Sequence, residues 1–410
     1  MRISYGMELL GRGRHGLVWA TTVTMAEHSE YVGRVFAMKK APVSNHIRHP
    51  MLLHEACAIV LLQGHPSIPK GVAWGRSQFF EYLVMERLDR NLEETIAAQG
   101  QGRLTLRNLV ILMSQMQLDV IEHVHDKGIL HCDIKPRNFV FGSQSEGKGG
   151  RLHLVDFGLS RPWIDPKTGQ PFPEELNVSF RGTLHLASRN VHLGHTPSRR
   201  DDIVSIAYTL VKLLTGTLPW GEAKTQNEVL PILYAHTGST LCQGYDNVFA
   251  QFVDYACGLQ YDETPKYQRW RQAFLDLVPG LSADAPFNPE DDSEPRVGVQ
   301  KNENDDLLRC EDCPKAPVYP ISDFFQNRVY GCESQSSKGG KHGFVPNWGS
   351  SWSCGTPIRA EEVFGDEFAV VKESLEFIDA PPDYSNGPCA YEGLAPPEVI
   401  KNAQSDLHRI

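Results

Sequence analysis

The chain has no apolar run that approaches the roughly 18 residues of a membrane-spanning helix. Its first residues also lack the sustained apolar core of a secretory signal. We therefore expect neither a membrane span nor secretory targeting. The nine cysteines are scattered rather than grouped at the spacings of a disulfide framework. They are typical of reduced thiols, which predicts a cytoplasmic or nuclear protein.

A basic surplus is also lacking, because the net charge is −10. Direct binding of nucleic acid is therefore disfavoured. Residues 1–278 carry 29 basic and 27 acidic side chains, whereas residues 279–410 carry 11 basic and 23 acidic ones. The second part also holds 14 of the 27 prolines. We infer a domain over residues 1–278, long enough for two lobes, followed by an extension.

The extension over residues 279–410 is acidic and proline-rich, and the sequence does not predict its fold. We expect it to be partly disordered, with solvated linkers at 291–294 and 334–340 and a short helix or strand within 361–378. Cys310 and Cys313 have the spacing of one pair of zinc ligands. No second pair follows, so free thiols are the favoured alternative to a metal site.

The stretch His-Cys-Asp-Ile-Lys-Pro-Arg-Asn at 131–138 carries the most chemistry. Asp133 could accept the proton of a substrate hydroxyl, and Lys135 could neutralise a transferring phosphoryl group. Asn138 and Asp156, the latter opening an Asp-Phe-Gly triplet, offer hard oxygen ligands to Mg²⁺. Each could alone be an ordinary polar loop residue. Together their spacing matches the catalytic loop and metal-binding triplet of protein kinases.

A second motif, G-x-G-x-x-G-x-V, occupies residues 11–18. Alone it could be a glycine-rich hairpin turn. The β-branched residues 18–24 predict a strand after it, rather than the helix of a dinucleotide-binding fold, and a glycine loop between two strands is the kinase arrangement. The residues expected to contact a nucleotide are Leu10, Gly11, Arg12, Gly13, Arg14, His15, Gly16, Leu17, Val18, Ala37, Lys39, Glu86 and Leu88.

Lys39 ends a predicted strand at 35–39 and could hold the α- and β-phosphates of ATP. The helix predicted over 51–62 contains one acid, Glu55, which we expect to pair with Lys39. The alternatives are an ordinary strand-end lysine and a solvated helix face. A further strand at 79–86 leads into a hinge, where backbone groups could meet adenine.

The second half of the domain is predicted to be mainly helical. A long helix over 104–126, capped by Thr105 and stopped by Gly128, would deliver the catalytic loop. Asp202 is expected to open the helix 203–214 and hold the backbone of the catalytic loop from below. Two more helices are predicted over 249–259 and 267–278.

Over residues 5–278 the chain resembles the casein kinase 1 family of Ser/Thr protein kinases. The resemblance rests on Ser67-Ile68-Pro69, Val84-Met85-Glu86, Ser188-Arg189-Asn190-Val191-His192-Leu193-Gly194, Ser198-Arg199-Arg200-Asp201-Asp202, Leu218-Pro219-Trp220 and Cys257-Gly258-Leu259-Gln260-Tyr261-Asp262. It implies an α+β, bilobal protein-kinase fold. The N-lobe, about 1–86, would be a small antiparallel sheet with one helix, and the C-lobe, about 89–278, would be mainly helical. It also implies ATP and Mg²⁺ as cofactors.

In such kinases Thr183 would bond to the catalytic aspartate and lysine, which favours Ser or Thr as the acceptor. Activity usually needs no phosphorylation of the activation segment, and Cys132, where most kinases have arginine, is compatible with that. His185 stands where the family has an arginine that binds acidic or phosphorylated substrates. A preference for such substrates therefore does not carry over.

We therefore predict an active Ser/Thr protein kinase whose partners are protein substrates. The alternatives are a catalytically weak pseudokinase scaffold and a kinase for a small molecule. The complete set of catalytic residues argues against the scaffold, and the casein-kinase-like segments argue against the small molecule. The acidic extension could compete with substrate on the kinase lobe, or it could merely confer solubility.

Overall fold

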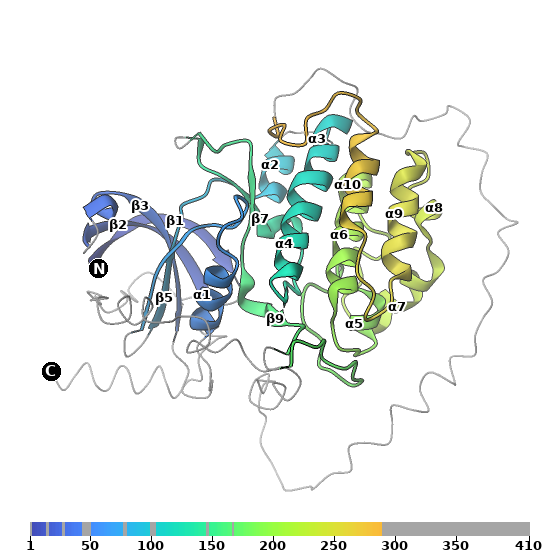
Figure 1. Ribbon diagram of the computed structural model, residues 1–410, viewed down its shortest axis with the longest axis horizontal. Helices are drawn as coiled ribbons and strands as arrows, with labels where there is room; N and C mark the ends of the chain where they lie inside the picture. The colour runs from blue at the N-terminus through green and yellow to red at the C-terminus, as the bar shows by residue number, and fades with distance from the viewer. Residues whose placement is uncertain are drawn as a thin grey trace, which may run out of the picture.

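The computed structural model describes residues 2–13, 16–26, 29–42, 51–76, 80–98, 104–144, 147–165 and 168–288. Strands gather at one end of this part of the chain and helices at the other (Figure 1). The sequence predicted this α+β, two-lobed architecture. Arg14, His15, Cys310, Cys313 and the segments predicted within 291–378 lie outside the described residues.

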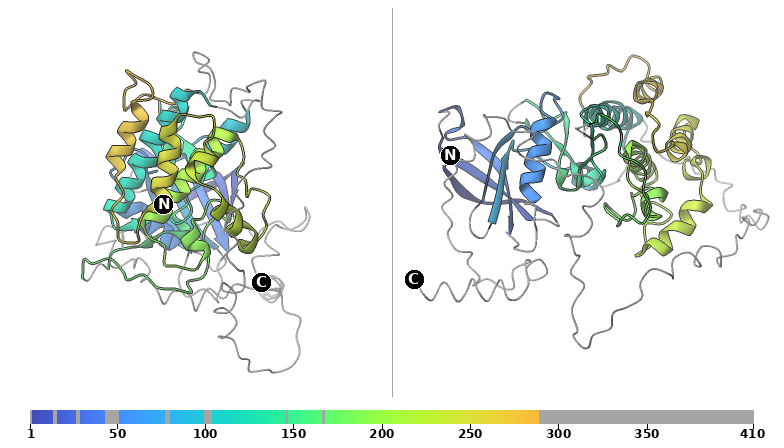
Figure 2. Two further views of the ribbon diagram at one scale, coloured as in Figure 1. Left: turned by 90° about the vertical axis from the view of Figure 1, so that its right-hand side faces the viewer. Right: turned by 60° about the horizontal axis from the view of Figure 1, so that its bottom comes forward.

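The N-lobe is a five-stranded antiparallel sheet in the order β1-β2-β3-β5-β4. The sheet curls beside a single long helix, α1 (Figure 2). The elements are β1 (Arg2–Gly13), β2 (Gly16–Met25), the short 3₁₀ turn η1 (Ser29–Tyr31), β3 (Val35–Pro42), α1 (Met51–Leu61), β4 (Gly71–Arg76) and β5 (Phe80–Met85).

Alternation along β3 determines which side chains face the cleft between the lobes. Phe36 and Met38 pack into a small cluster on the outer face of the sheet. Ala37 faces the other way, into the main core that α1 also joins, and Lys39 shares this face because side chains alternate along a strand. The strand continues to Pro42, so Lys39 lies inside it rather than at its end as the sequence suggested.

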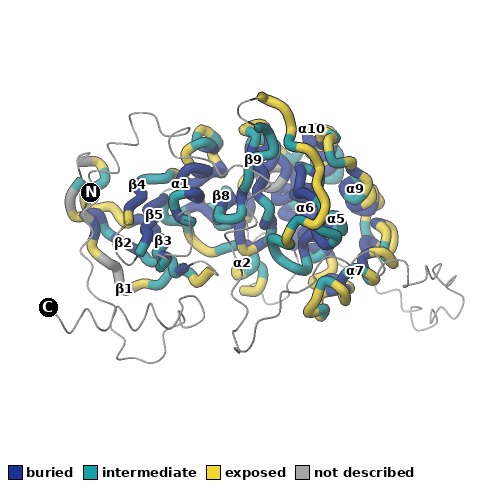
Figure 3. Tube along the Cα trace, turned by 90° about the horizontal axis from the view of Figure 1, so that it is seen from below, coloured by how far each residue is buried: buried dark blue, intermediate teal, exposed yellow. Residues whose placement is uncertain are grey.

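The C-lobe is helical apart from short strand pairs, β6 with β9 and β7 with β8. Its central helix, α6, is buried along most of its length (Figure 3). The helices are α2 (Leu92–Ala98), α3 (Leu106–Ile111), α4 (Val120–Asp126), α5 (Arg189–His192), α6 (Arg199–Thr215), α7 (Gln226–Ala235), α8 (Gly238–Leu241), α9 (Asn247–Gly258) and α10 (Tyr267–Leu275). The remaining elements are β6 (Ile129–Leu130), η3 (Pro136–Asn138), β7 (Phe139–Phe141), β8 (Leu152–Leu154), η5 (Phe157–Leu159) and β9 (Arg161–Pro162).

The long helix predicted over 104–126 is continuous but not uniform. It begins after Thr105, whose hydroxyl accepts the Asn108 N–H at 3.1 Å, and the chain turns away at Gly128, where φ is 75°. Between α3 and α4, residues Leu112–Asp119 form a π-helical segment, η2. Nothing in the apolar spacing predicted this change of hydrogen-bond pattern.

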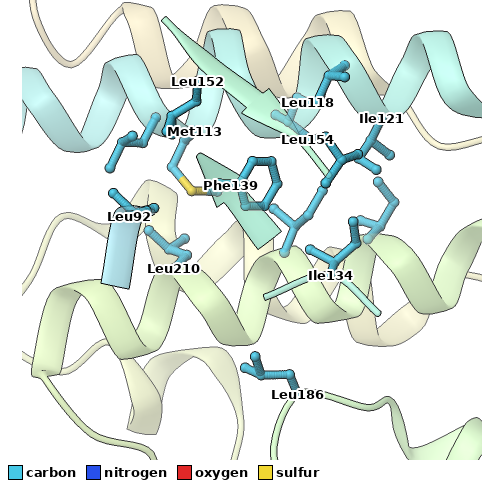
Figure 4. Close-up of a cluster of buried hydrophobic side chains, with 14 of the residues drawn as sticks. Leu92, Met113, Leu118, Ile121, Ile134, Phe139, Leu152, Leu154, Leu186 and Leu210 are labelled. Carbon is cyan, nitrogen blue, oxygen red and sulfur yellow. The ribbon is translucent and has the colours of Figure 1, made fainter. Parts of the chain in front are cut away.

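One apolar cluster joins the helices to the strands that carry the catalytic residues. Side chains from six different elements meet there (Figure 4). Those labelled are Leu92, Met113, Leu118, Ile121, Ile134, Phe139, Leu152, Leu154, Leu186 and Leu210. Because Ile134 and Phe139 belong to this cluster, the catalytic loop is anchored in the core on both sides of Lys135.

Several boundaries differ from the sequence prediction. α6 begins after Ser198, so Asp202 lies in its first turn rather than at its start. α2, α5, α7, α8 and β4 were not predicted, because they are short or lack a clear apolar period. The packed chain also continues past the compositional boundary at Val278, since Ala285 and Phe287 are buried in the main core.

No helix in the described part of the chain is long and apolar enough to cross a membrane.

Gly216, which follows α6, should be needed for its backbone conformation alone. Its φ is 83°, and a Cβ there would meet no atom within 4 Å. Gly216→Ala should therefore lower the free energy of unfolding by about 1 kcal/mol through left-handed strain. Gly258, at the end of α9, is the matched control, because its added Cβ also meets nothing and its φ is not positive. Gly258→Ala should be neutral or slightly stabilising in urea unfolding. Equal effects would contradict this account.

Candidate active site

The roof of the cleft is the hairpin that joins β1 to β2. Gly11 pairs with Val18 and Gly13 pairs with Gly16 across it, with Arg12 opposite Leu17. Leu10 and Val18 are half-buried against the main core, and Ala37 is buried beside them. The structure thus brings together the predicted nucleotide contacts of β1, β2 and β3.

The glycines of this hairpin serve different purposes. A Cβ on Gly16 would lie 2.2 Å from the Lys40 carbonyl oxygen, so the close approach of β3 requires glycine there. A Cβ on Gly11 would meet no atom of the described residues within 4 Å. Packing within the protein does not explain that glycine, whereas the close approach of a phosphate would. The hairpin therefore has room for the nucleotide that its sequence predicts.

The hinge follows β5. The Glu86 N–H donates to the Lys70 carbonyl at 2.8 Å, and its carboxylate accepts the Lys70 N–H and forms an ion pair with Lys148. Because the side chain and the N–H are both engaged in this way, contact between Glu86 and a base would have to come from the Glu86 carbonyl. Leu88, also predicted to contact the nucleotide, lies farther along the hinge and lines a cavity that includes Leu10.

Lys39 connects three parts of the site. Its ammonium lies 2.7 Å from Glu55 Oε2 on α1 and 2.7 Å from Asp156 Oδ1. Burial alone would lower the pKa of Lys39, but the carboxylates of Asp156 and Glu55 raise it above the usual value. The lysine is therefore a permanent cation, and the Lys39–Glu55 pair predicted from the sequence is present.

A second contact holds α1 against the Asp156 segment. His54 Nε2 donates to the Ser160 carbonyl at 2.9 Å, and the Ser160 hydroxyl donates to the Phe157 carbonyl at 2.7 Å. His54 was not among the residues predicted for the site. Its position next to Glu55 was the available signal, but its partner lies 106 residues away.

The catalytic loop arranges Asp133, Lys135 and Thr183 as a triangle. The Thr183 hydroxyl donates to Asp133 Oδ1 at 2.7 Å, and Lys135 Nζ lies 2.5 Å from Asp133 Oδ2 and 3.3 Å from Thr183 Oγ1. Each carboxylate oxygen has two lone pairs, so Asp133 can still accept a proton or a substrate hydroxyl. The positive charge of Lys135 lies beside that acceptor.

Asn138 and Asp156 could hold a divalent cation. The Asn138 Nδ2 donates to the Asp133 carbonyl at 2.9 Å, which fixes the amide and leaves its oxygen as the atom that could bind a cation. Asp156 has a left-handed backbone, φ 66°, and its side chain is 33% exposed. One amide oxygen and one carboxylate are hard ligands of the kind that Mg²⁺ prefers, so the donor set fits this ion.

Asp202 positions the backbone of the catalytic loop. It accepts the N–H of His131 at 2.8 Å and the N–H of Cys132 at 2.9 Å, as the sequence predicted. Its Oδ2 also accepts from His125 Nε2 at 3.0 Å, and the other ring nitrogen of His125 faces the Tyr267 hydroxyl at 2.5 Å. Burial opposes its ionisation, but these hydrogen bonds and the nearby imidazoles hold the pKa of Asp202 below its usual range.

His131 links the catalytic loop to the Asp156 segment. Its Nδ1 accepts the Asp133 N–H at 3.2 Å, and its Nε2 donates to the Val155 carbonyl at 3.1 Å. The ring also meets the edge of Phe157, with centroids 5.0 Å apart. The sequence offers no reason to assign a role to His131 or His125: the His131 ring bridges two backbone groups, and the partners of the His125 ring, Asp202 and Tyr267, lie 77 and 142 residues away.

A comparison with protein families finds one matching family model. The model, described as protein kinase domain, matches residues 6–257. The match covers more than half of the chain and includes the hairpin, Lys39, the catalytic loop and Asp156.

Asp202→Asn should destabilise the fold. The side-chain NH₂ group of the asparagine would face hydrogen-bond donors that Asp202 now accepts from, and a backbone N–H would be left unpaired. We expect a loss of about 2–4 kcal/mol in the free energy of unfolding. Asp254→Asn is the matched control: its Oδ1 accepts the Gly238 N–H at 2.6 Å, but its side chain is exposed. That variant should stay within about 0.5 kcal/mol of wild type. Similar losses for the two variants would contradict the role given to Asp202.

Proposed function

The chain belongs to the protein kinase family, and from that premise we propose that it is an active Ser/Thr protein kinase related to casein kinase 1. Family membership implies ATP, protein substrates and usually Mg²⁺. The observation that carries the proposal is the triangle of Asp133, Lys135 and Thr183, held with Asp156, Lys39 and Glu55 in one continuous cleft.

The transfer step uses this chain's own groups. Asp133 orients the substrate hydroxyl and accepts its proton as the oxygen bonds to the γ-phosphorus. The bond between that phosphorus and the oxygen bridging to the β-phosphate breaks, and ADP leaves with the bonding pair. Lys135 stabilises charge on the transferring group, and Lys39 holds the other phosphates. Mg²⁺, held by Asn138 and Asp156, would neutralise charge on the phosphate oxygens.

Thr183 supports Ser or Thr as the acceptor. Its hydroxyl bridges Asp133 and Lys135, the contact that the resemblance to Ser/Thr kinases implies. Ser188, in the segment 188–194 on which the resemblance to casein kinase 1 partly rests, bonds to the Asp201 carboxylate and caps α5. The contacts of Thr183 and those of Ser188 both support the relation to casein kinase 1.

We do not extend the proposal to a preference for phosphorylated substrates. His185 Nε2 donates to the Ala223 carbonyl at 2.6 Å, and the His185 carbonyl accepts from Trp220 Nε1 at 2.7 Å. A ring engaged with a backbone carbonyl is a poor substitute for an arginine that binds a substrate phosphate.

The activation segment supports activity without phosphorylation. Glu174 lies 2.6 Å from Arg200 and 2.9 Å from His195, so a carboxylate already occupies these two side chains. Trp163 donates to the His125 carbonyl at 2.9 Å and lies under the Arg199 guanidinium, 4.0 Å from it. Burial raises the pKa of the Cys132 thiol, which keeps it neutral and unable to bind a phosphate.

We also propose a cytoplasmic or nuclear location, as the sequence suggested. The four cysteines in the described part of the chain are free thiols, which is compatible with a reducing compartment.

Phosphate transfer from ATP with Mg²⁺ to an acidic Ser/Thr protein should fall by about 100-fold or more in Asp133→Asn, because the general base is lost. Asp262→Asn, an exposed carboxylate in the loop after α9, should match wild type. Initial rates of radiolabel transfer would measure both, and phosphoamino-acid analysis of the product would identify the acceptor. ATP binding without transfer in the wild type would favour the scaffold, and phosphotyrosine would overturn Ser/Thr specificity.

Treatment of the purified protein with a phosphatase should leave its initial rate within a few-fold of the untreated protein. The reason is that Glu174, Arg200 and His195 hold the activation segment without a phosphate. Mass spectrometry would verify dephosphorylation before the assay. A collapse of activity that returned on rephosphorylation would contradict phosphorylation-independent activity.

A further inference from the structure

Residues 279–288, here called the strap, extend the packed chain beyond α10. In Figure 1 the strap is the gold segment that crosses the end of α3. It lies outside both the matched residues 6–257 and the boundary suggested by composition.

Two kinds of contact fix the end of the strap. The Asn108 Nδ2 donates to the Asn288 carbonyl at 2.6 Å, and Asn108 Oδ1 accepts the Asn288 N–H at 3.2 Å. The Phe287 N–H donates to the Gly150 carbonyl at 3.0 Å. Gly150 permits this approach, because a Cβ there would lie 2.4 Å from Pro286 Cβ.

These contacts place Phe287 next to the hinge. Its side chain is 3% exposed, and its ring packs on Phe141 with centroids 4.9 Å apart. Phe141 in turn pairs with the hinge backbone: its carbonyl accepts the Asp89 N–H at 2.8 Å, and its N–H donates to the Arg90 carbonyl at 3.0 Å. Leu88 directly precedes these residues. Phe287 therefore supports the hinge through one intervening side chain.

A cavity of about 570 Å³ opens at the same place. Leu10 and Leu88, both predicted nucleotide contacts, line it together with Phe141 and Phe287. The cavity therefore adjoins two residues of the predicted nucleotide site, and the strap supplies part of its wall.

We propose that Phe287 is a positioning residue for the nucleotide. It forms part of the wall of this cavity and fixes the hinge through Phe141, so the strap belongs to the nucleotide site. The inference rests on the proposed kinase function. The catalytic loop is held separately by Asp202, so loss of Phe287 should weaken nucleotide binding more than turnover.

A purely structural role for Phe287 predicts a different result. In that case any buried aromatic of the C-lobe should have the same effect when truncated. Phe274 in α10 is a suitable control, because it is fully buried against Phe249 and Phe252 and does not line the cavity. Truncating it should lower stability and leave nucleotide affinity unchanged.

The experiment compares wild type, Phe287→Ala and Phe274→Ala in the full chain. Titration calorimetry with Mg²⁺ and a non-hydrolysable ATP analogue gives Kd, and a thermal melt gives Tm. We expect Phe287→Ala to raise Kd about fivefold or more, which is about 1 kcal/mol. The KM for ATP should rise in parallel, whereas the KM for the protein substrate should not. Phe287→Leu should recover much of the affinity.

Phe274→Ala should lower Tm at least as much and keep Kd within about twofold of wild type. A Kd for Phe287→Ala within that range, or an equal rise in both variants, would overturn the inference. If Phe287→Ala does not fold, Asn108→Ala, which removes both bonds to Asn288, should raise Kd in the same direction.

The calorimetry separates this inference from the proposed function. A wild type that binds the analogue but transfers no phosphate would contradict the kinase activity, and the Kd values would still decide the role of Phe287. A wild type that does not bind the analogue would contradict both.

Discussion

The buried carboxylate of Asp202 is the interaction on which the rest of the site depends. The catalytic loop has little regular structure, and Cys132 adopts a left-handed backbone with φ 65°. Such a conformation persists only where its surroundings fix it. Asp202 does so by accepting two consecutive backbone N–H groups, and its place in the first turn of the buried helix α6 gives it a rigid support. A charge this deeply buried is tolerable because His125 and the two N–H groups satisfy it.

Further contacts connect the catalytic loop to the rest of the site. His131 forms hydrogen bonds to the backbone of Asp133 and of Val155, which immediately precedes Asp156. Asp156 then meets Lys39, whose ammonium joins the C-lobe to β3 and α1 of the N-lobe. Glu55 and Asp156 share the ammonium of Lys39 there, so the relative position of the lobes is coupled to the charge state of the cleft. A charged ligand that binds near Lys39 would therefore affect the positions of both lobes together.

The sequence predicted the parts of this site that depend on fixed spacing. Lys39 and Glu55 could be paired because one lies on a clear strand and the other is the only acid of an apolar helix. Asp133, Lys135 and Asn138 share a single loop, so their proximity needed no knowledge of the fold. The partners of His54 and His125 could not be predicted, because each bridges segments far apart in the sequence without a charge pattern.

Errors in the fold prediction have equally local causes. The π-helical segment η2 has the same apolar residues as an ordinary helix, so period alone cannot distinguish them. The boundary near Val278 followed charge and proline content, but packing continues beyond it, because Phe287, twelve residues after the end of α10 at Leu275, is buried in the core. A single buried aromatic in a polar segment is too weak a signal for composition to detect.

The side chain of Asn108 binds the strap through the backbone atoms of residue 288, which limits the length of the strap more than its sequence. These two bonds use the carbonyl and the N–H of residue 288, so they do not depend on which side chain it carries. The number of residues between α10 and Phe287, in contrast, is constrained. An insertion or deletion between α10 and Phe287 would move the ring away from Phe141 while the amide of Asn108 could still bind whichever residue replaced Asn288. In related chains the spacing of this connection should therefore vary less than its sequence.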